Sequence, residues 1–122
     1  MSNAPLLFKI AGSIFALLPV GHTLMARDVL FPGLRVLGGS QAAYSSKVSW
    51  TQANGYFITA ALLCFKWAQE GLQPGLDRYV LYALMATHTS TGLAYAKKGI
   101  MPPAGVYWFT TALLGLAASK AI

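Results

Sequence analysis

Apolar residues occur in long uncharged runs along this chain. Eighteen uncharged residues separate Arg78 from Lys97, and twenty-one separate Lys98 from Lys120. A helix without a polar stripe must be buried in protein or in lipid. At about 1.5 Å per residue, each run comes close to the roughly 30 Å thickness of the hydrocarbon layer of a bilayer. The pattern therefore predicts helices that cross a membrane.

Four spans are expected, separated by segments that contain glycine and proline. Lys9 lies near one end of the first span and Lys66 near the end of the second, so both ammonium groups can extend to the lipid headgroups. The predicted breaks are Phe31-Pro32-Gly33, Gly38-Gly39-Ser40, Gln73-Pro74-Gly75 and the stretch 97–103, which ends in Pro102-Pro103. The four spans are residues 6–25, 49–67, 79–96 and 104–119.

The first connection, residues 26–48, is long enough to hold a segment that lies on the membrane surface. Arg27, Arg35 and Lys47 alternate there with apolar side chains, which is typical of an interfacial helix. We therefore predict an all-α fold, an integral membrane four-helix bundle with an interfacial segment in the first loop. Residues 1–122 are expected to form a single membrane domain.

Composition agrees with this prediction. Hydrophobic residues make up 56% of the chain and charged residues only 10%, whereas charged residues are about 25% of ordinary globular proteins. The formal charge of +6 is spread over the span ends, which favours contact with anionic lipid headgroups over nucleic acid. No basic region precedes the first apolar run, so we expect that run to be a retained span rather than a signal peptide.

Polar side chains inside the spans are the candidate site, because an unpartnered polar group in hydrocarbon costs several kcal/mol and is expected to face the bundle interior. His22 lies about one turn before the end of the first span. Trp50, Gln52 and Asn54 open the second span on the same side, and these four residues are expected to meet.

The third and fourth spans contribute polar residues to the same half of the membrane. Thr91 and Tyr95 follow His88 at positions i+3 and i+7, which places them on one helix face. Tyr107 lies where the fourth span begins. The candidate substrate-binding residues are Trp50, Gln52, Asn54, Thr91, Tyr95 and Tyr107.

Packing is the alternative explanation for many polar and small residues. Histidine, threonine, asparagine and glutamine form interhelical hydrogen bonds worth about 0.6 to 2 kcal/mol, and interfacial Trp and Tyr commonly anchor helices. We assign the stripe Gln52, Tyr56 and Thr59 to packing. The small residues assigned to close helix contact are Gly12, Ala16, Thr111, Gly115 and Ser119, and Cys64 is also expected to pack.

The two histidines are the candidate catalytic residues. A histidine inside the bundle can accept or donate a proton near neutral pH, so His22 and His88 are possible general acid and base groups. Asp28 could orient an imidazole if the chain turns back after the first span. No metal-ligand spacing such as CxxC or HExxH occurs, and we expect no metal or other cofactor. A bis-histidine haem is a minor alternative that would require tilted helices.

The layout resembles the small four-span scaffold protein of the ergosterol pathway. The resemblance lies in the polar break after the first span, in Trp50-Thr51, in His88-Thr89-Ser90 and in the approach from Gly99 to Pro103. The chain is also similar in size and hydrophobicity to small membrane proteins of fungal biosynthetic clusters, which assist a membrane-bound oxidase such as a cytochrome P450. Both resemblances imply a protein of the endoplasmic reticulum, and neither assigns a catalytic residue.

Two classes of function follow from the sequence. The first is an accessory or scaffold protein for a membrane-bound enzyme that makes a lipophilic metabolite, a sterol or a compound derived from terpenoid or polyketide precursors. The second is a membrane-embedded isomerase, cyclase or hydrolase that uses His22 and His88 on an apolar substrate. A structural subunit of a mitochondrial membrane complex is a third alternative. The expected partners are membrane lipids, the biosynthetic enzyme and an apolar small molecule.

Overall fold

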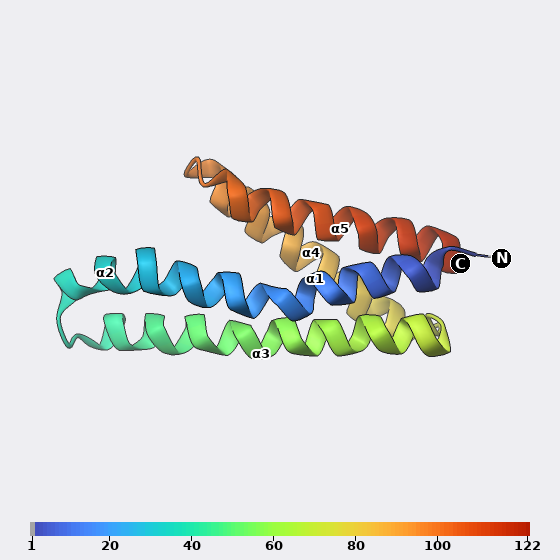
Figure 1. The fold of residues 1–122 in the computed structure, drawn as a ribbon, viewed down its shortest axis with the longest axis horizontal. Coiled ribbons are helices and arrows are strands. Elements are labelled where there is room, and N and C mark those ends of the chain that lie inside the picture. Colours follow the sequence, from blue (N-terminus) through green and yellow to red (C-terminus); the bar gives the residue numbers. More distant parts are fainter. Residues whose placement is uncertain (1) are drawn as a thin grey trace.

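The computed structural model describes residues 2–122, and within them the chain forms four long helices and no strand (Figure 1). The predicted all-α fold is confirmed. Each long helix contains one of the four predicted segments and extends beyond it at one or both ends. The long helices are α1 (Ala4–Met25), α3 (Gln41–Glu70), α4 (Leu76–Lys97) and α5 (Met101–Ala121).

The connection between α1 and α3 differs from the prediction. A π-helical turn (Ala26–Leu30), the short helix α2 (Phe31–Leu34) and a 3-10 turn (Arg35–Leu37) follow α1 without an intervening loop. The predicted break at 31–33 is therefore wrong, and so is the long loop around a separate segment. Pro32 lies in the first turn of α2, a position where its fixed φ is compatible with a helix and its missing N–H is least costly.

The actual turn consists of three residues, Gly38 to Ser40. Gly38 has φ 58°, a conformation that glycine adopts without the steric cost of a Cβ. Ser40 then caps α3, because its Oγ accepts a hydrogen bond from the backbone N–H of Ala43 at 3.2 Å. At the far end of α3, Gly71 with φ 79° ends the helix. The 38–40 break is confirmed.

The helices form two antiparallel hairpins, α1 with α3 and α4 with α5, and α1 also packs along α5 (Figure 1). Both termini lie at one end of the bundle, where the Ser2 hydroxyl donates to the carbonyl of Lys120 at 2.7 Å. At the opposite end the α1–α3 hairpin reaches well beyond the turn between α4 and α5 (Figure 1). The α1–α3 hairpin thus has a protruding tip.

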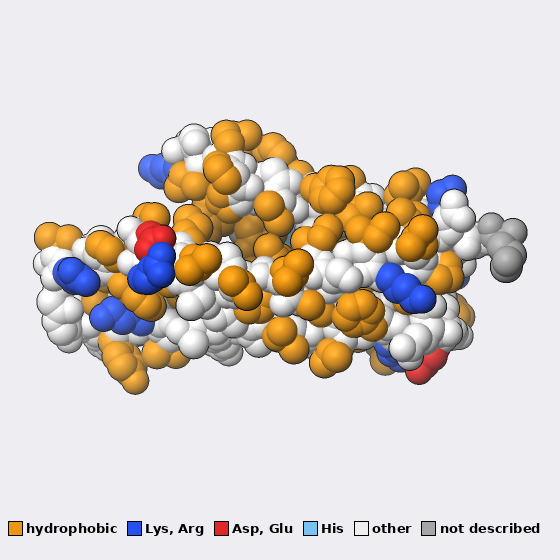
Figure 2. Space-filling view, in the orientation of Figure 1, with side chains coloured by type: hydrophobic (Ala, Val, Ile, Leu, Met, Phe, Trp, Pro, Cys, Tyr) orange, Lys and Arg blue, Asp and Glu red, His pale blue; other side chains and the backbone are white. Residues whose placement is uncertain are grey.

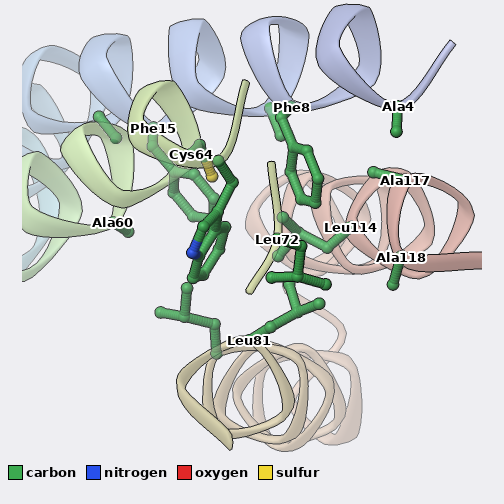
Figure 3. Close-up of a cluster of buried hydrophobic side chains, with 14 of the residues drawn as sticks. Ala4, Phe8, Phe15, Ala60, Cys64, Leu72, Leu81, Leu114, Ala117 and Ala118 are labelled. Atoms are coloured by element: carbon green, nitrogen blue, oxygen red, sulfur yellow. The ribbon is translucent and has the colours of Figure 1, made fainter. Parts of the chain in front are cut away.

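The hydrophobic core occupies the half of the bundle nearer the termini. Side chains from all four long helices meet there (Figure 3). Gly12 brings α1 close to α3, because a Cβ at this position would lie 3.1 Å from the Cβ of Cys64. The close-contact role predicted for Gly12 agrees with this geometry. The largest fully buried core side chains are Phe8, Phe15, Trp67, Leu81 and Leu114.

Every long helix has an uncharged middle with charged residues at or near both ends. Figure 2 shows hydrophobic side chains over the middle of the visible face, with lysine, arginine and acidic side chains gathered toward the two ends. We refer to the middle zone as the uncharged band. It comprises 17 residues between Lys9 and Arg27, 18 between Lys47 and Lys66, 18 between Arg78 and Lys97, and 21 between Lys98 and Lys120.

By length and composition, one helix of the described residues could cross a membrane. It is the continuous helical stretch Ala4–Leu37 of 34 residues. Only 28% of its most apolar window is buried inside the protein, whereas the core helix of a soluble protein is mostly covered. The helices that contain the other three predicted spans are less apolar and do not meet the same criterion.

Candidate functional site

A cleft of about 270 Å³ opens between α1 and α5 in the half of the bundle away from the termini. Figure 2 shows this hollow between the surfaces of α5 and α1. It forms because α5 diverges from α1 beyond the shared core (Figure 1). The walls are almost wholly apolar. The lining residues are Leu18, Gly21, His22, Met25, Phe57, Tyr95, Pro102, Pro103, Val106 and Tyr107.

His22 lies in the wall of the cleft and is held by Asn54 and Trp50 of α3. Its Nδ1 lies 3.0 Å from Oδ1 of Asn54, and the Nδ2 of Asn54 donates to the Thr23 hydroxyl at 3.3 Å. Trp50 stacks on the imidazole, with ring centroids 4.1 Å apart and planes 4° from parallel. Trp50 Nε1 also donates to the backbone carbonyl of His22 at 2.9 Å. The position and the plane of the imidazole are therefore both fixed.

Asn54 occupies the orienting role that we expected for Asp28. The Asp28 carboxylate lies on the exposed side of the π-helical turn, where it accepts a hydrogen bond from Arg27 Nε at 2.6 Å. This hydrogen bond lowers the pKa of the Asp28 carboxyl. The expectation that Asp28 orients an imidazole is therefore wrong.

His88 is fully buried and forms a second cluster behind the cleft. Its Nε2 shares a hydrogen bond with the Tyr56 hydroxyl at 3.2 Å. Phe15 and Tyr107 cover the ring, at centroid distances of 4.9 Å and 5.2 Å. The Nδ1 atom has no partner among residues 2–122. His88 is thus shielded from the cleft by the residues around it.

Two aromatic rings connect the histidines. Phe57 lies 5.3 Å from His22 and 6.3 Å from Tyr107, measured between ring centroids. Tyr107 in turn contacts His88. A shift of the Tyr107 ring would therefore change the packing around both histidines. The two clusters share no hydrogen bond within the described residues.

The cleft contains two phenol groups in addition to His22. Tyr95 and Tyr107 are stacked, with centroids 6.0 Å apart and planes 11° from parallel. Both line the cleft, and neither hydroxyl hydrogen-bonds to another of the described residues. The lining residues whose side chains carry a polar group are thus His22, Tyr95 and Tyr107.

The structure assembles most of the predicted site residues, but not all of them. His22, Trp50 and Asn54 meet as expected, but of these three only His22 lines the cleft, together with Tyr95 and Tyr107. Trp50 and Asn54 contact His22 without lining the cleft, so their predicted substrate-binding role is not supported by its geometry. Gln52, in contrast, is exposed and lines a separate shallow depression beside Lys47.

The two candidate residues on α4 that precede Tyr95 also lie outside the cleft. Thr91 is half-buried on α4 and does not line it. His88 is not in the lining either. The convergence predicted from sequence is therefore divided between the cleft and the buried cluster behind it.

Sequence reasoning missed Tyr56 and Phe57. Tyr56 belongs to the stripe that we assigned to packing, yet its hydroxyl contacts His88. Phe57 lies three residues after Asn54, hence on the same helix face, and this spacing was the signal that could have identified it. The cleft-lining prolines, Pro102 and Pro103, were assigned to the break before the fourth span, whereas the structure places them in the first turn of α5.

No protein-family model, curated protein or solved structure matches this chain.

Proposed function

We propose that this chain is a multi-pass membrane protein that holds an apolar small molecule in its cleft and presents it to a membrane-bound biosynthetic enzyme. The observation that carries the proposal is the cleft itself, whose walls are almost wholly apolar and whose polar groups are few and fixed. Such a composition is typical of sites for lipophilic ligands. The partner would be an enzyme of lipophilic-metabolite synthesis, such as a cytochrome P450 of the endoplasmic reticulum.

The uncharged band supports a membrane location. Its 17 to 21 residues per helix correspond to roughly 26 to 32 Å at helical rise, close to the thickness of the hydrocarbon layer. Large apolar side chains also point outward within the band. In water, these side chains would be exposed to solvent without contact with another apolar surface. Examples on three helices are Leu17, Leu62 and Phe109, all more than half exposed.

The position of the cleft within the band supports a ligand that arrives from the lipid. The lining residues of α1, Leu18 to Met25, lie between Lys9 and Arg27, and those of α5 follow Lys98. A molecule entering there would come from the hydrocarbon layer without crossing a charged surface. Apolar metabolites concentrate in that layer because burying their surface away from water is favourable.

The protruding tip supports a docking role. Arg27, Arg35 and Lys47 lie along it, and Lys47 Nζ lies 5.8 Å from the ring centroid of Phe31. Val36 is 87% exposed and Tyr44 is 70% exposed. An apolar surface rimmed by basic residues is suited to a partner with acidic residues around an apolar patch.

Deletion in the native host followed by metabolite profiling tests the proposal. Loss of the protein is expected to accumulate a lipophilic precursor, which a wild-type copy should clear. Gly21→Phe should not clear it, because the new side chain would fill the cleft without meeting other atoms at its Cβ. Gly55→Phe is the matched control, since Gly55 has equally open space but lies outside the cleft. Full rescue by Gly21→Phe would contradict the proposal.

One observation favours an enzymatic alternative. His22 is oriented by Asn54 at the edge of the cleft, an arrangement that an acid–base catalyst also requires. Against it stands the absence of any carboxylate from the lining residues. Purified protein would decide between the two, because an accessory protein binds the accumulated precursor unchanged, whereas an isomerase, cyclase or hydrolase converts it and loses turnover in His22→Ala.

A further inference from the structure

Hydrogen bonding around His22 determines which of its ring nitrogens can meet a ligand. Asn54 Nδ2 is a donor and is directed at the Thr23 hydroxyl, 3.3 Å away. The other end of the amide, Oδ1, can only accept, and it lies 3.0 Å from His22 Nδ1. With the amide in this orientation, Nδ1 carries the proton and donates it to Oδ1. In the neutral imidazole this leaves Nε2 as a hydrogen-bond acceptor.

Nε2 has no partner among the described residues, although His22 lines the cleft. Trp50 stacking and the Asn54 hydrogen bond prevent the ring from rotating to find one. An acceptor held in an apolar wall costs free energy unless something donates to it. Water can do so when no ligand is bound, and a ligand that displaces the water must provide its own donor.

Two phenol groups can act as the second hydrogen-bond partner of a ligand that donates to Nε2. Tyr95 and Tyr107 line the same cleft with hydroxyls that bond to no other described residue, and a phenol can donate as well as accept. A ligand hydroxyl can donate to Nε2 of His22 and accept from a tyrosine. A ketone or ether can only accept, which leaves Nε2 without a donor, and a carboxylate would bring charge into an apolar cleft.

We infer that the cleft selects molecules with an apolar body and a hydroxyl group, and that the hydroxyl donates to Nε2 of His22. This inference rests on the proposed function, because it assumes that the cleft holds an apolar molecule. It adds the chemical class of that molecule, an alcohol or phenol, and assigns the recognition to His22. Asn54 is a positioning residue that fixes the imidazole tautomer.

A matched pair of probes tests the inference. Radiolabelled farnesol and farnesyl methyl ether share one apolar body and differ in the hydroxyl hydrogen, so equilibrium binding of both to the purified protein in lipid nanodiscs isolates the donor. We expect the alcohol to bind about tenfold more tightly, the effect of one hydrogen bond. His22→Phe should bind both equally, because phenylalanine preserves a ring against Trp50 but offers no acceptor. Asn54→Leu should also reduce the preference.

Binding of the ether reports whether each variant is folded and whether its cleft is intact. Equal affinity of the two probes for the wild-type protein, with both excluded by Gly21→Phe, would overturn the inference and leave the proposed cleft function standing. An alcohol preference that survives in His22→Phe would also overturn it. Absence of binding of either probe, or binding that Gly21→Phe does not reduce, would contradict both the inference and the proposed function.

Discussion

At the residue scale, the interior of this bundle is defined by the way its few polar side chains find partners across helices. His22 on α1 is held by Asn54 and Trp50 of α3, and His88 on α4 is held by Tyr56 of α3. Both histidines therefore tie a neighbouring helix to α3. Such contacts fix which faces of the helices meet, which apolar side chains alone leave less strictly determined.

Removal of the Tyr56 hydroxyl tests the buried cluster. Tyr56→Phe leaves His88 without its hydrogen bond in a fully buried position, so we expect a loss of about 1 to 3 kcal/mol in the free energy of unfolding. Tyr82→Phe is the control, because Tyr82 is exposed on the same helix as His88. Thermal unfolding in detergent, followed by circular dichroism, measures both. Equal midpoints for the two variants would show that the hydrogen bond adds no stability.

The contact between Gly92 and Trp108 gives a second residue-scale prediction. A Cβ at Gly92 would lie 2.3 Å from Nε1 of Trp108, so the indole must move and lose its 3.4 Å hydrogen bond to the Thr89 carbonyl. We expect Gly92→Ala to lower stability by about 1 to 3 kcal/mol, as overpacking does.

The control for this prediction is Gly105→Ala, where a Cβ meets no atom within 4 Å. It should be neutral or raise the unfolding midpoint, since alanine is favoured over glycine in a helix by about 1 kcal/mol. A Gly92→Ala protein that unfolds at or above the wild-type temperature would contradict the close packing of α4 against α5.

The sequence predicted part of this site because position along a helix limits which residues can meet. His22, Trp50 and Asn54 are near the same end of neighbouring helices, and they do meet. Gln52 was included for the same reason but points elsewhere. Side chains two positions apart on a helix point in directions about 200° apart around the helix axis. Gln52 and Asn54 therefore cannot both face α1. Helix rotation depends on packing between helices and is not contained in the spacing of one segment.

At the element scale, the main finding is that helical structure continues from α1 to Leu37. The number of long helices could be predicted, because each has an apolar run long enough to be recognised. The 31–33 segment was misjudged, since proline in the first turn of a helix and proline in a loop give the same local signal. Only the two consecutive glycines, Gly38 and Gly39, marked the turn correctly.

The α3–α4 connection is expected to be sensitive to acid. Asp77 accepts hydrogen bonds from Lys66 Nζ at 3.0 Å and from the Gln73 backbone N–H at 3.2 Å. The hydrogen bond from Lys66 is the main reason that the pKa of Asp77 is lowered from its ordinary 3.8. A depressed folded-state pKa stabilises the protein above the unfolded value, and this contribution disappears as pH falls through the folded value.

The measurement is the unfolding midpoint of wild type and Asp77→Asn as pH is lowered from neutral to below 3.8, the ordinary pKa of the carboxyl. Wild type should be the more stable at neutral pH, and the difference should shrink below that value. Glu70→Gln is the control, because Glu70 is 3.6 Å from Lys66 in a more exposed ion pair. A difference between wild type and Asp77→Asn that is constant across this range would contradict the assigned role of Asp77.

At the scale of the whole molecule, the cleft lies within the uncharged band. The hairpins share a core near the termini and separate toward the other end, so a cleft opens where α1 and α5 diverge (Figure 1). If lipid surrounds the band, this cleft is open to lipophilic molecules and the protruding tip lies at or beyond the headgroups. Membrane crossing by all four long helices is therefore the central claim of the proposed function.

Labelling of single cysteines in sealed microsomes tests that claim most directly. In a Cys64→Ala background, cysteines at Gly39, Pro74 and Lys98 report on the three turns between the long helices. A membrane-impermeant maleimide should label positions 39 and 98 from one side only and position 74 from the other. Labelling of all three positions from the outside of intact vesicles would show that the helices do not cross the bilayer and would contradict the account.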